Sequence, residues 1–141
     1  MMEMAKSSSF TRLIDPNAQQ FVAPDNMIEA IREYLGEPEL PVEDVLSSVY
    51  HSLAASYARS VKTIEKVSGK EIELINIIGG GSKDGYLNLL TKKYTGKRVL
   101  AGPTEATAIG NLLAQFMYAD PSLTLEKGRE MIKNSFSIYE V

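Results

Sequence analysis

Three consecutive glycines, Gly79, Gly80 and Gly81, are the residues whose type and spacing could serve chemistry. An apolar run rich in β-branched residues precedes them, as in a strand, and apolar residues at helical spacing follow from Leu87. A glycine turn between a strand and a helix can bring backbone N–H groups close to a phosphate or a ribose, and glycine also tolerates a positive φ. The pattern indicates a nucleotide contact, although a tight turn that binds nothing fits it equally well.

Two known nucleotide-binding motifs do not fit this turn. A dinucleotide fingerprint requires G-x-G-x-x-G, whereas Gly79, Gly81 and Gly85 are spaced as G-x-G-x-x-x-G. A Walker A loop requires Gly-Lys-Ser or Gly-Lys-Thr after its four-residue gap, but Gly85 is followed by Tyr86 and Leu87. The turn is therefore neither a dinucleotide fingerprint nor a Walker A loop.

The composition excludes several classes of protein. A net charge of −3 and a pI near 5.2 argue against a nucleic-acid surface, which would be basic. There is no cysteine and only one histidine, His51, so thiolate and multi-histidine metal sites are excluded, and we expect His51 to be structural. No apolar run reaches the roughly 18 residues that a membrane span needs. We expect one cytoplasmic, soluble domain over residues 1–141, without catalytic residues or metal ligands.

An irregular arm and two helices are expected before the turn. Residues 1–24 contain several breakers and are predicted to form an irregular arm. A helix is predicted over 25–35, where Asn26 suits the N-cap and Gly36 suits the position after the last turn. A second helix is predicted over 42–67, because apolar residues recur there at helical spacing, and a rise of ~1.5 Å per residue makes it about 40 Å long.

The remaining elements alternate between strand and helix. In order, we predict a strand over 72–78, a helix over 82–94, a strand over 98–101, a helix opening at 102–105 and running to 119, and a last helix over 124–134. Pro103 is expected near the first helical position, where its missing N–H costs nothing. Two strands rarely make a self-sufficient sheet, so the chain looks like part of something larger.

Gly110 lies in the middle of one predicted helix, where glycine costs ~1 kcal/mol relative to alanine. With Ala106 and Ala114 it forms a stripe of small residues one helical turn apart. We expect this stripe to mark a close packing contact between the helix and the sheet. The alternative is a helix that lies behind the nucleotide-contacting turn.

Two segments together resemble the C-terminal domain of FGGY-type carbohydrate kinases. They are Ile-Ile-Gly-Gly-Gly-Ser-Lys-Asp at 77–84 and Ala-Gly-Pro-Thr-Glu-Ala-Thr-Ala-Ile-Gly-Asn at 101–111. Segments 10–16, 21–24 and 52–57 also resemble the family, in the family's order, so the similarity covers nearly the whole chain. The resemblance implies an α/β fold that is part of the C-terminal lobe of an actin/hexokinase-like (ribonuclease H-like) ATPase, helix-rich with a short sheet.

The resemblance also implies a function, an ATP-dependent sugar kinase in which the glycine turn lies against the nucleotide. Gly79, Gly80 and Gly81 would supply backbone contacts, and Ser82 and Asp84 would be nearby polar groups. The sugar pocket, the general base and the main Mg²⁺ site belong to parts of the family absent here. The expected partners are ATP, the sugar and a missing N-terminal lobe, with no nucleic acid and no membrane. The chain alone would be an inactive C-terminal fragment that is prone to self-association.

Three other interpretations stay open on the sequence alone. The sugar itself stays open, because the missing parts of the family set most of the sugar specificity, so the chain could derive from any of several FGGY sugar kinases. It could be a non-catalytic module that binds nucleotide or a protein partner. It could also be a structural domain whose glycine turn binds nothing.

Overall fold

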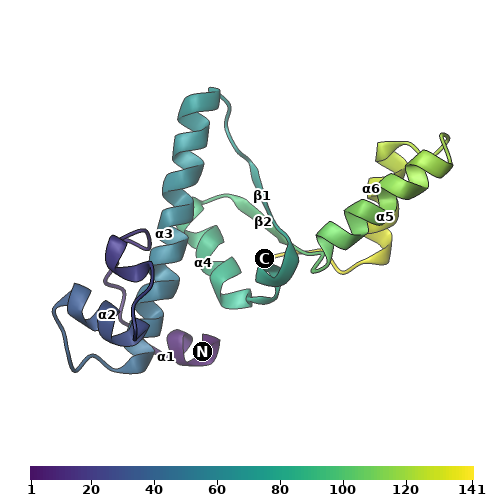
Figure 1. Ribbon diagram of the computed structural model, residues 1–141. Coiled ribbons are helices and arrows are strands. Elements are labelled where there is room, and N and C mark those ends of the chain that lie inside the picture. The colour runs from purple at the N-terminus through teal and green to yellow at the C-terminus, as the bar shows by residue number, and fades with distance from the viewer.

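The computed structural model describes all residues of the chain, 1–141. It contains six α-helices, two 3₁₀ helices and three strands (Figure 1). In chain order they are α1 (Met2–Ser7), η1 (Gln19–Phe21), α2 (Met27–Leu35), α3 (Val42–Ser68), β1 (Leu74–Ile77), η2 (Gly79–Lys83), α4 (Gly85–Thr95), β2 (Arg98–Ala101), α5 (Ala106–Ala119), α6 (Leu125–Ser135) and β3 (Tyr139–Glu140). The helix-rich arrangement with a short mixed sheet is consistent with the α/β class expected from the sequence.

The long helix α3 is the element against which α1, α2 and α4 pack (Figure 1). The ends of α2 follow the sequence prediction. Asn26 caps α2 by accepting hydrogen bonds from the backbone N–H groups of Ile28 at 3.0 Å and Glu29 at 3.3 Å. Gly36 ends α2 and Gly69 ends α3, each in the left-handed conformation that glycine adopts without strain. None of the helices combines the length and the apolar character that a membrane crossing requires.

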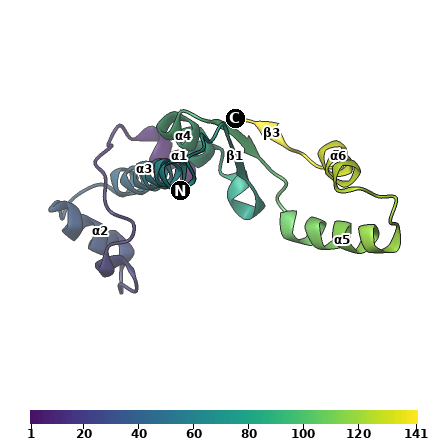
Figure 2. The ribbon, with the colours of Figure 1, turned by 90° about the horizontal axis from the view of Figure 1, so that it is seen from above.

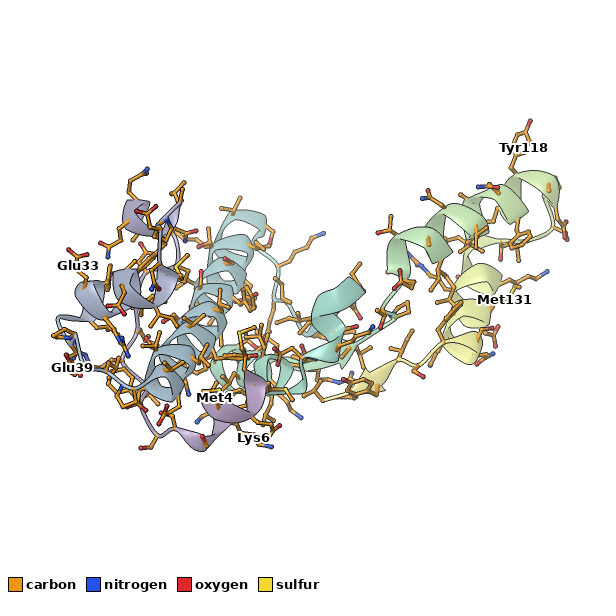
Figure 3. The ribbon with its side chains drawn as sticks, turned by 60° about the horizontal axis from the view of Figure 1, so that its bottom comes forward. Met4, Lys6, Glu33, Glu39, Tyr118 and Met131 are labelled. Atoms are coloured by element: carbon orange, nitrogen blue, oxygen red, sulfur yellow. The ribbon has the colours of Figure 1, made fainter.

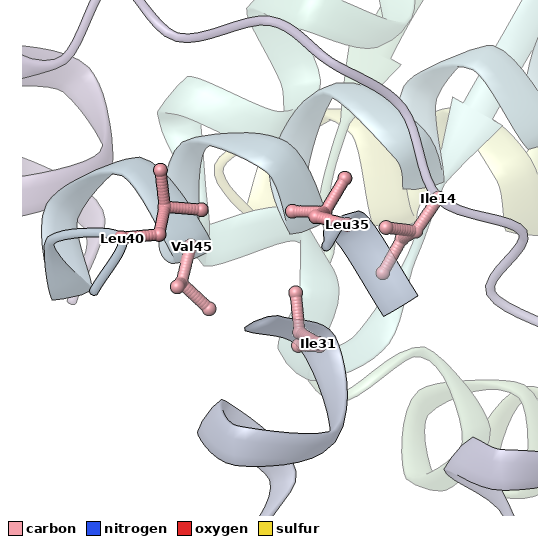
Figure 4. Close-up of a cluster of buried hydrophobic side chains, with 5 residues drawn as sticks. All are labelled: Ile14, Ile31, Leu35, Leu40 and Val45. Atoms are coloured by element: carbon pink, nitrogen blue, oxygen red, sulfur yellow. The ribbon is translucent and has the colours of Figure 1, made fainter. Parts of the chain in front are cut away.

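A cluster of five buried apolar side chains joins α2 and α3 to the segments that precede each of them. Figure 4 shows these side chains: Ile14, Ile31, Leu35, Leu40 and Val45. Ile31 and Leu35 lie one helical turn apart, so both point from α2 toward the cluster. Burying one such side chain contributes about 1.5–3 kcal/mol to folding. The cluster therefore fixes α2 and the residues around Ile14 against α3.

The sheet has the order β1-β2-β3, so β2 is its central strand. β1 and β2 are parallel, with Leu74 opposite Arg98, and α4 connects them. β3 is antiparallel to β2, with Tyr139 opposite Ala101. Val99 and Ala101 of the central strand are fully buried. The parallel β1 and β2 both end at the side of the sheet where η2 and the start of α5 lie.

The helices α5 and α6 form a hairpin that stands away from the other helices (Figure 1, Figure 2). The chain enters the hairpin from β2 and returns from it to β3. A Cβ atom on Gly128 would lie 2.6 Å from Cδ1 of Leu113, so a larger residue where the two helices meet would require the Leu113 side chain to move. Tyr118, near the end of α5 in Figure 3, is 92% exposed.

The arm (residues 1–24) and the tail (residues 136–141, after α6) contain elements that the sequence did not predict. Residues 1–24 are not wholly irregular, because α1 and η1 lie within them and Ala5 of α1 is fully buried. The N-cap of α1 makes no side-chain hydrogen bond, so contact with α3 stabilises this short helix. The sheet has three strands, where two were predicted. β3 is only two residues long and leaves no periodic pattern in the sequence.

Three predictions about helix positions are wrong. Pro103 does not occupy the first helical position of α5, because Glu105 is the N-cap and the helix begins at Ala106. Gly110 marks no close contact: a Cβ atom there would meet nothing within 4 Å. The predicted helix at 82–94 begins later, at Gly85, because the preceding residues form the tighter η2 turn.

Candidate functional site

The two segments that resemble the family lie side by side at the ends of β1 and β2. The backbone N–H of Gly79 donates to the carbonyl oxygen of Pro103 at 3.1 Å, and the N–H of Gly102 donates to the carbonyl oxygen of Ile77 at 2.9 Å. These two bonds continue the pairing of the strands beyond the sheet. Gly79 has a φ of +74°, a conformation that disfavours any other residue, so the turn itself requires this glycine.

Gly80 and Gly81 differ from Gly79, because their backbone conformation does not require glycine. Neither has a positive φ, so neither uses the conformational freedom that glycine offers. A Cβ atom on Gly80 would meet nothing within 4 Å, and one on Gly81 would meet only Cγ2 of Ile77, at 4.0 Å. Both residues are exposed. The chain's own packing therefore leaves open space beside these two residues, where a ligand could approach the backbone.

Ser82 lies inside the turn and is 4% exposed. Its hydroxyl donates to the carbonyl oxygen of Gly79 at 2.7 Å. Its own carbonyl oxygen accepts two hydrogen bonds, from Nδ2 of Asn88 at 3.0 Å and from the Tyr139 hydroxyl at 3.2 Å. The Ser82 side chain thus stabilises the turn from within, and α4 and β3 both contact its backbone.

Asp84 ends the turn and caps α4. Its Oδ1 accepts a hydrogen bond from the backbone N–H of Leu87 at 3.0 Å, and its Oδ2 accepts one from the Tyr50 hydroxyl of α3 at 2.6 Å. Burial, and then the hydrogen bond to Asp84, raise the pKa of Tyr50 to about 12, so Tyr50 stays protonated and keeps donating. The carboxylate offsets the positive end of the α4 dipole, which disfavours a phosphate at this position.

His51 is buried on α3, next to Tyr50, and is 5% exposed. Its Nδ1 lies 2.7 Å from the Tyr94 hydroxyl of α4, and the two rings meet edge to face. Burial, with a smaller effect of the Lys93 charge, lowers the pKa of His51. The expectation that His51 is structural agrees with this position. No group of three or more His, Asp or Glu side chains is arranged to hold a metal ion.

A cavity of about 350 Å³ lies between α3, β1 and α4, and Gly81 lines it at the turn. Apolar residues contribute much of its wall, among them Val61, Ile75 and Ile77. Asn88 also lines it, and the Oδ1 of this residue is buried without a hydrogen-bond partner. A larger cavity of about 830 Å³ lies between the arm and α3 and includes none of the turn residues.

Sequence reasoning found the turn but missed three residues that hold it, Tyr50, Asn88 and Tyr139. Tyr50 fits the apolar pattern of its helix, and nothing in the sequence links it to Asp84, 34 positions away. Asn88 left a usable signal, because it is a polar residue among the leucines of α4. Tyr139 lies in the strand that was not predicted.

Comparison with known proteins defines the class to which this fold and turn belong. A sequence model described as the C-terminal domain of the FGGY family of carbohydrate kinases matches residues 2–119. The chain therefore belongs to the FGGY family of carbohydrate kinases.

Within this family, the chain is similar to proteins named rhamnulokinase. The one from Oceanobacillus iheyensis is 43% identical over 141 residues, which cover 96% of this chain and 30% of that protein. The one from Halalkalibacterium halodurans is 42% identical, with 98% and 30% covered. The one from Bacillus subtilis is 37% identical, with 96% and 29% covered. The resemblance to FGGY-type carbohydrate kinases noted from the sequence is confirmed, and the chain spans about 30% of the length of these rhamnulokinase relatives.

Proposed function

We propose that the chain supplies part of the ATP site of a sugar kinase whose reaction is the phosphorylation of L-rhamnulose to L-rhamnulose 1-phosphate. The family match and the rhamnulokinase relatives support this reaction. The observation that carries the role of the chain is the open space beside Gly80 and Gly81. The chain's own packing does not require glycine at either position. We infer a cytoplasmic location, because ATP is the proposed phosphate donor.

Each turn residue has a defined part in this proposal. Gly80 and Gly81 let the nucleotide approach the backbone, and Gly79 gives the turn its shape. Ser82 and Asp84 fix the turn from inside and at its end. Because the Asp84 carboxylate disfavours a phosphate beside it, the turn faces the uncharged ribose or base of the nucleotide.

The residues near the turn do not fit a Mg²⁺ ion. Asp84 supplies the carboxylate of the turn, and both of its oxygens accept hydrogen bonds from the protein. Phosphoryl transfer needs positioning of the nucleotide, stabilisation of charge and orientation of the nucleophile. This chain contributes to the first of these. Mg²⁺ and sugar binding would fall to the parts of the relatives that the chain does not match.

A hybrid enzyme tests this function. In it, residues 1–141 replace the matching segment of the Oceanobacillus iheyensis rhamnulokinase. We expect the hybrid enzyme to phosphorylate L-rhamnulose with ATP and Mg²⁺, and the 141-residue chain alone to show no turnover above a protein-free blank. Because the parts outside the chain set most of the sugar specificity, the sugar that the hybrid accepts reports on the Oceanobacillus iheyensis portion, and its ATP-dependent turnover reports on this chain. A folded hybrid without any kinase activity would favour a non-catalytic module.

A further inference from the structure

Two adjacent residues of α3 hold opposite ends of α4. Tyr50 donates its hydroxyl to Oδ2 of Asp84 at 2.6 Å, at the start of α4. His51 meets the Tyr94 hydroxyl at 2.7 Å, near the end of α4. The two bonds join the same pair of helices and are of similar length. They differ in position, because only the first one reaches the glycine turn.

The Tyr50 bond holds the oxygen of Asp84 that the cap does not use. Asp84 caps α4 by accepting a hydrogen bond from the N–H of Leu87 at Oδ1. A carboxylate held only at this oxygen can still turn about that hydrogen bond. The Tyr50 hydroxyl fixes the second oxygen, and the Tyr50 ring is itself held in contact with Tyr86, with ring centroids 5.3 Å apart. The side chain that closes the turn is therefore fixed from two helices at once.

We propose that Tyr50 is a positioning residue that holds the glycine turn, through Asp84, in the conformation that receives the nucleotide. This inference rests on the proposed function for its effect on ATP. The structural part stands on the Tyr50–Asp84 contact alone. Tyr50 does not contact the nucleotide in this proposal and acts only through Asp84.

Tyr50→Phe is the sharpest variant, because it removes the hydroxyl and keeps the ring that packs on Tyr86. Tyr94→Phe is the matched control: it removes the hydroxyl of the other bond between α3 and α4, away from the turn. Both variants should lower the melting temperature, since each loses one interhelical hydrogen bond, and Tyr50→Phe should lower it more, because its partner is a carboxylate. Only Tyr50→Phe should loosen the turn.

Amide hydrogen exchange, measured by NMR on the 141-residue chain, reports directly how often the turn opens. In Tyr50→Phe we expect the amides of residues 80–87 to exchange about tenfold faster, the effect of losing one hydrogen bond to a charged group. In Asp84→Ala the same Tyr50→Phe change should add nothing, because a residue that acts through Asp84 has no effect without it. Tyr94→Phe should leave these amides unchanged.

The hybrid enzyme supplies the functional readout. Tyr50→Phe should raise the Michaelis constant for ATP several-fold and leave that for L-rhamnulose within about twofold, whereas Tyr94→Phe should change neither. Turn amides that exchange alike in Tyr50→Phe and Tyr94→Phe would overturn the proposal. Faster exchange in Tyr50→Phe with an unchanged constant for ATP would support the Tyr50–Asp84 link and contradict the nucleotide role of the turn. The two failures are therefore distinguishable.

Discussion

Gly102 and Ser137 lie in direct backbone contact, which ties the segment after β2 to the tail that returns from the α5–α6 hairpin. A Cβ atom on Gly102 would be 2.3 Å from the carbonyl oxygen of Ser137, and Gly102 has a φ of +108°. The Ala-Gly-Pro segment that helped to place the chain in its family therefore contains a glycine that the structure itself requires. This contact also brings β3 into line with β2.

Gly102→Ala should destabilise the chain strongly. Alanine at this φ costs about 1–3 kcal/mol in backbone strain, and the clash with a backbone oxygen adds a cost of similar size, because backbone cannot move aside like a side chain. Urea unfolding followed by circular dichroism should show a loss of several kcal/mol or an unfolded variant. A loss below about 1 kcal/mol would show that the tail does not lie against Gly102.

Gly110→Ala is the matched control for this substitution. The residue lies within α5, and a Cβ atom there would meet nothing within 4 Å. The helix propensity of alanine should therefore raise the free energy of unfolding by about 0.5–1 kcal/mol. A destabilised Gly110→Ala chain would show that the small-residue stripe is covered after all.

The comparison of these two glycines shows what the sequence could predict. Local signals worked: Asn26 and Gly36 marked the ends of α2, and β-branched residues marked β1. Contacts between distant segments left no such signal. The sequence does not distinguish a glycine packed against a neighbouring backbone, as at Gly102, from one with open space beside it, as at Gly110.

The candidate site likewise has one part that the sequence could predict and one part that it could not. The glycine turn was predictable, because its sequence is local and the apolar residues on either side define the strand and the helix. The hydrogen bonds that hold the turn were not, because Tyr50, Asn88 and Tyr139 come from three different elements. Their meeting depends on how α3, α4 and β3 pack, which a pattern within one segment does not encode.

Stability should fall as the pH drops below about 6.5, through His51. Burial lowers the pKa of His51 from its ordinary value of 6.5, so below that value the unfolded chain binds a proton that the folded chain resists. This contribution is fully present above the unfolded pKa and is lost as the pH falls toward the folded one. Urea unfolding between about pH 7.5 and pH 5 measures it.

His51→Gln is the control for this pH dependence. His51 is the single histidine of the chain, and the carboxyl groups of Glu65 and Glu140 have pKa values lowered from 4.5, below this pH window. The slope of stability with pH should therefore disappear in the variant. An unchanged slope would assign it to another group.

The outer face of the hairpin should drive self-association of the 141-residue chain. α5 carries no charged residue, and Leu112, Phe116 and Met131 are each more than half exposed around one apolar groove. An apolar patch of this kind associates in water. Phe116→Glu should reduce the apparent mass in light scattering at high concentration, whereas Tyr118→Glu, outside the groove, should not. A parental chain that stays monomeric throughout would contradict the prediction.

The Michaelis constant for ATP in the hybrid enzyme with Gly80→Val tests the central claim most directly. Gly80 has no positive φ and open space where a Cβ would lie, so valine should leave the melting temperature close to parental. If the nucleotide occupies that space, the constant for ATP should rise about tenfold or more, with Gly80→Ala intermediate and the constant for L-rhamnulose nearly unchanged. A stable Gly80→Val enzyme with a parental constant for ATP would show that no nucleotide approaches the turn.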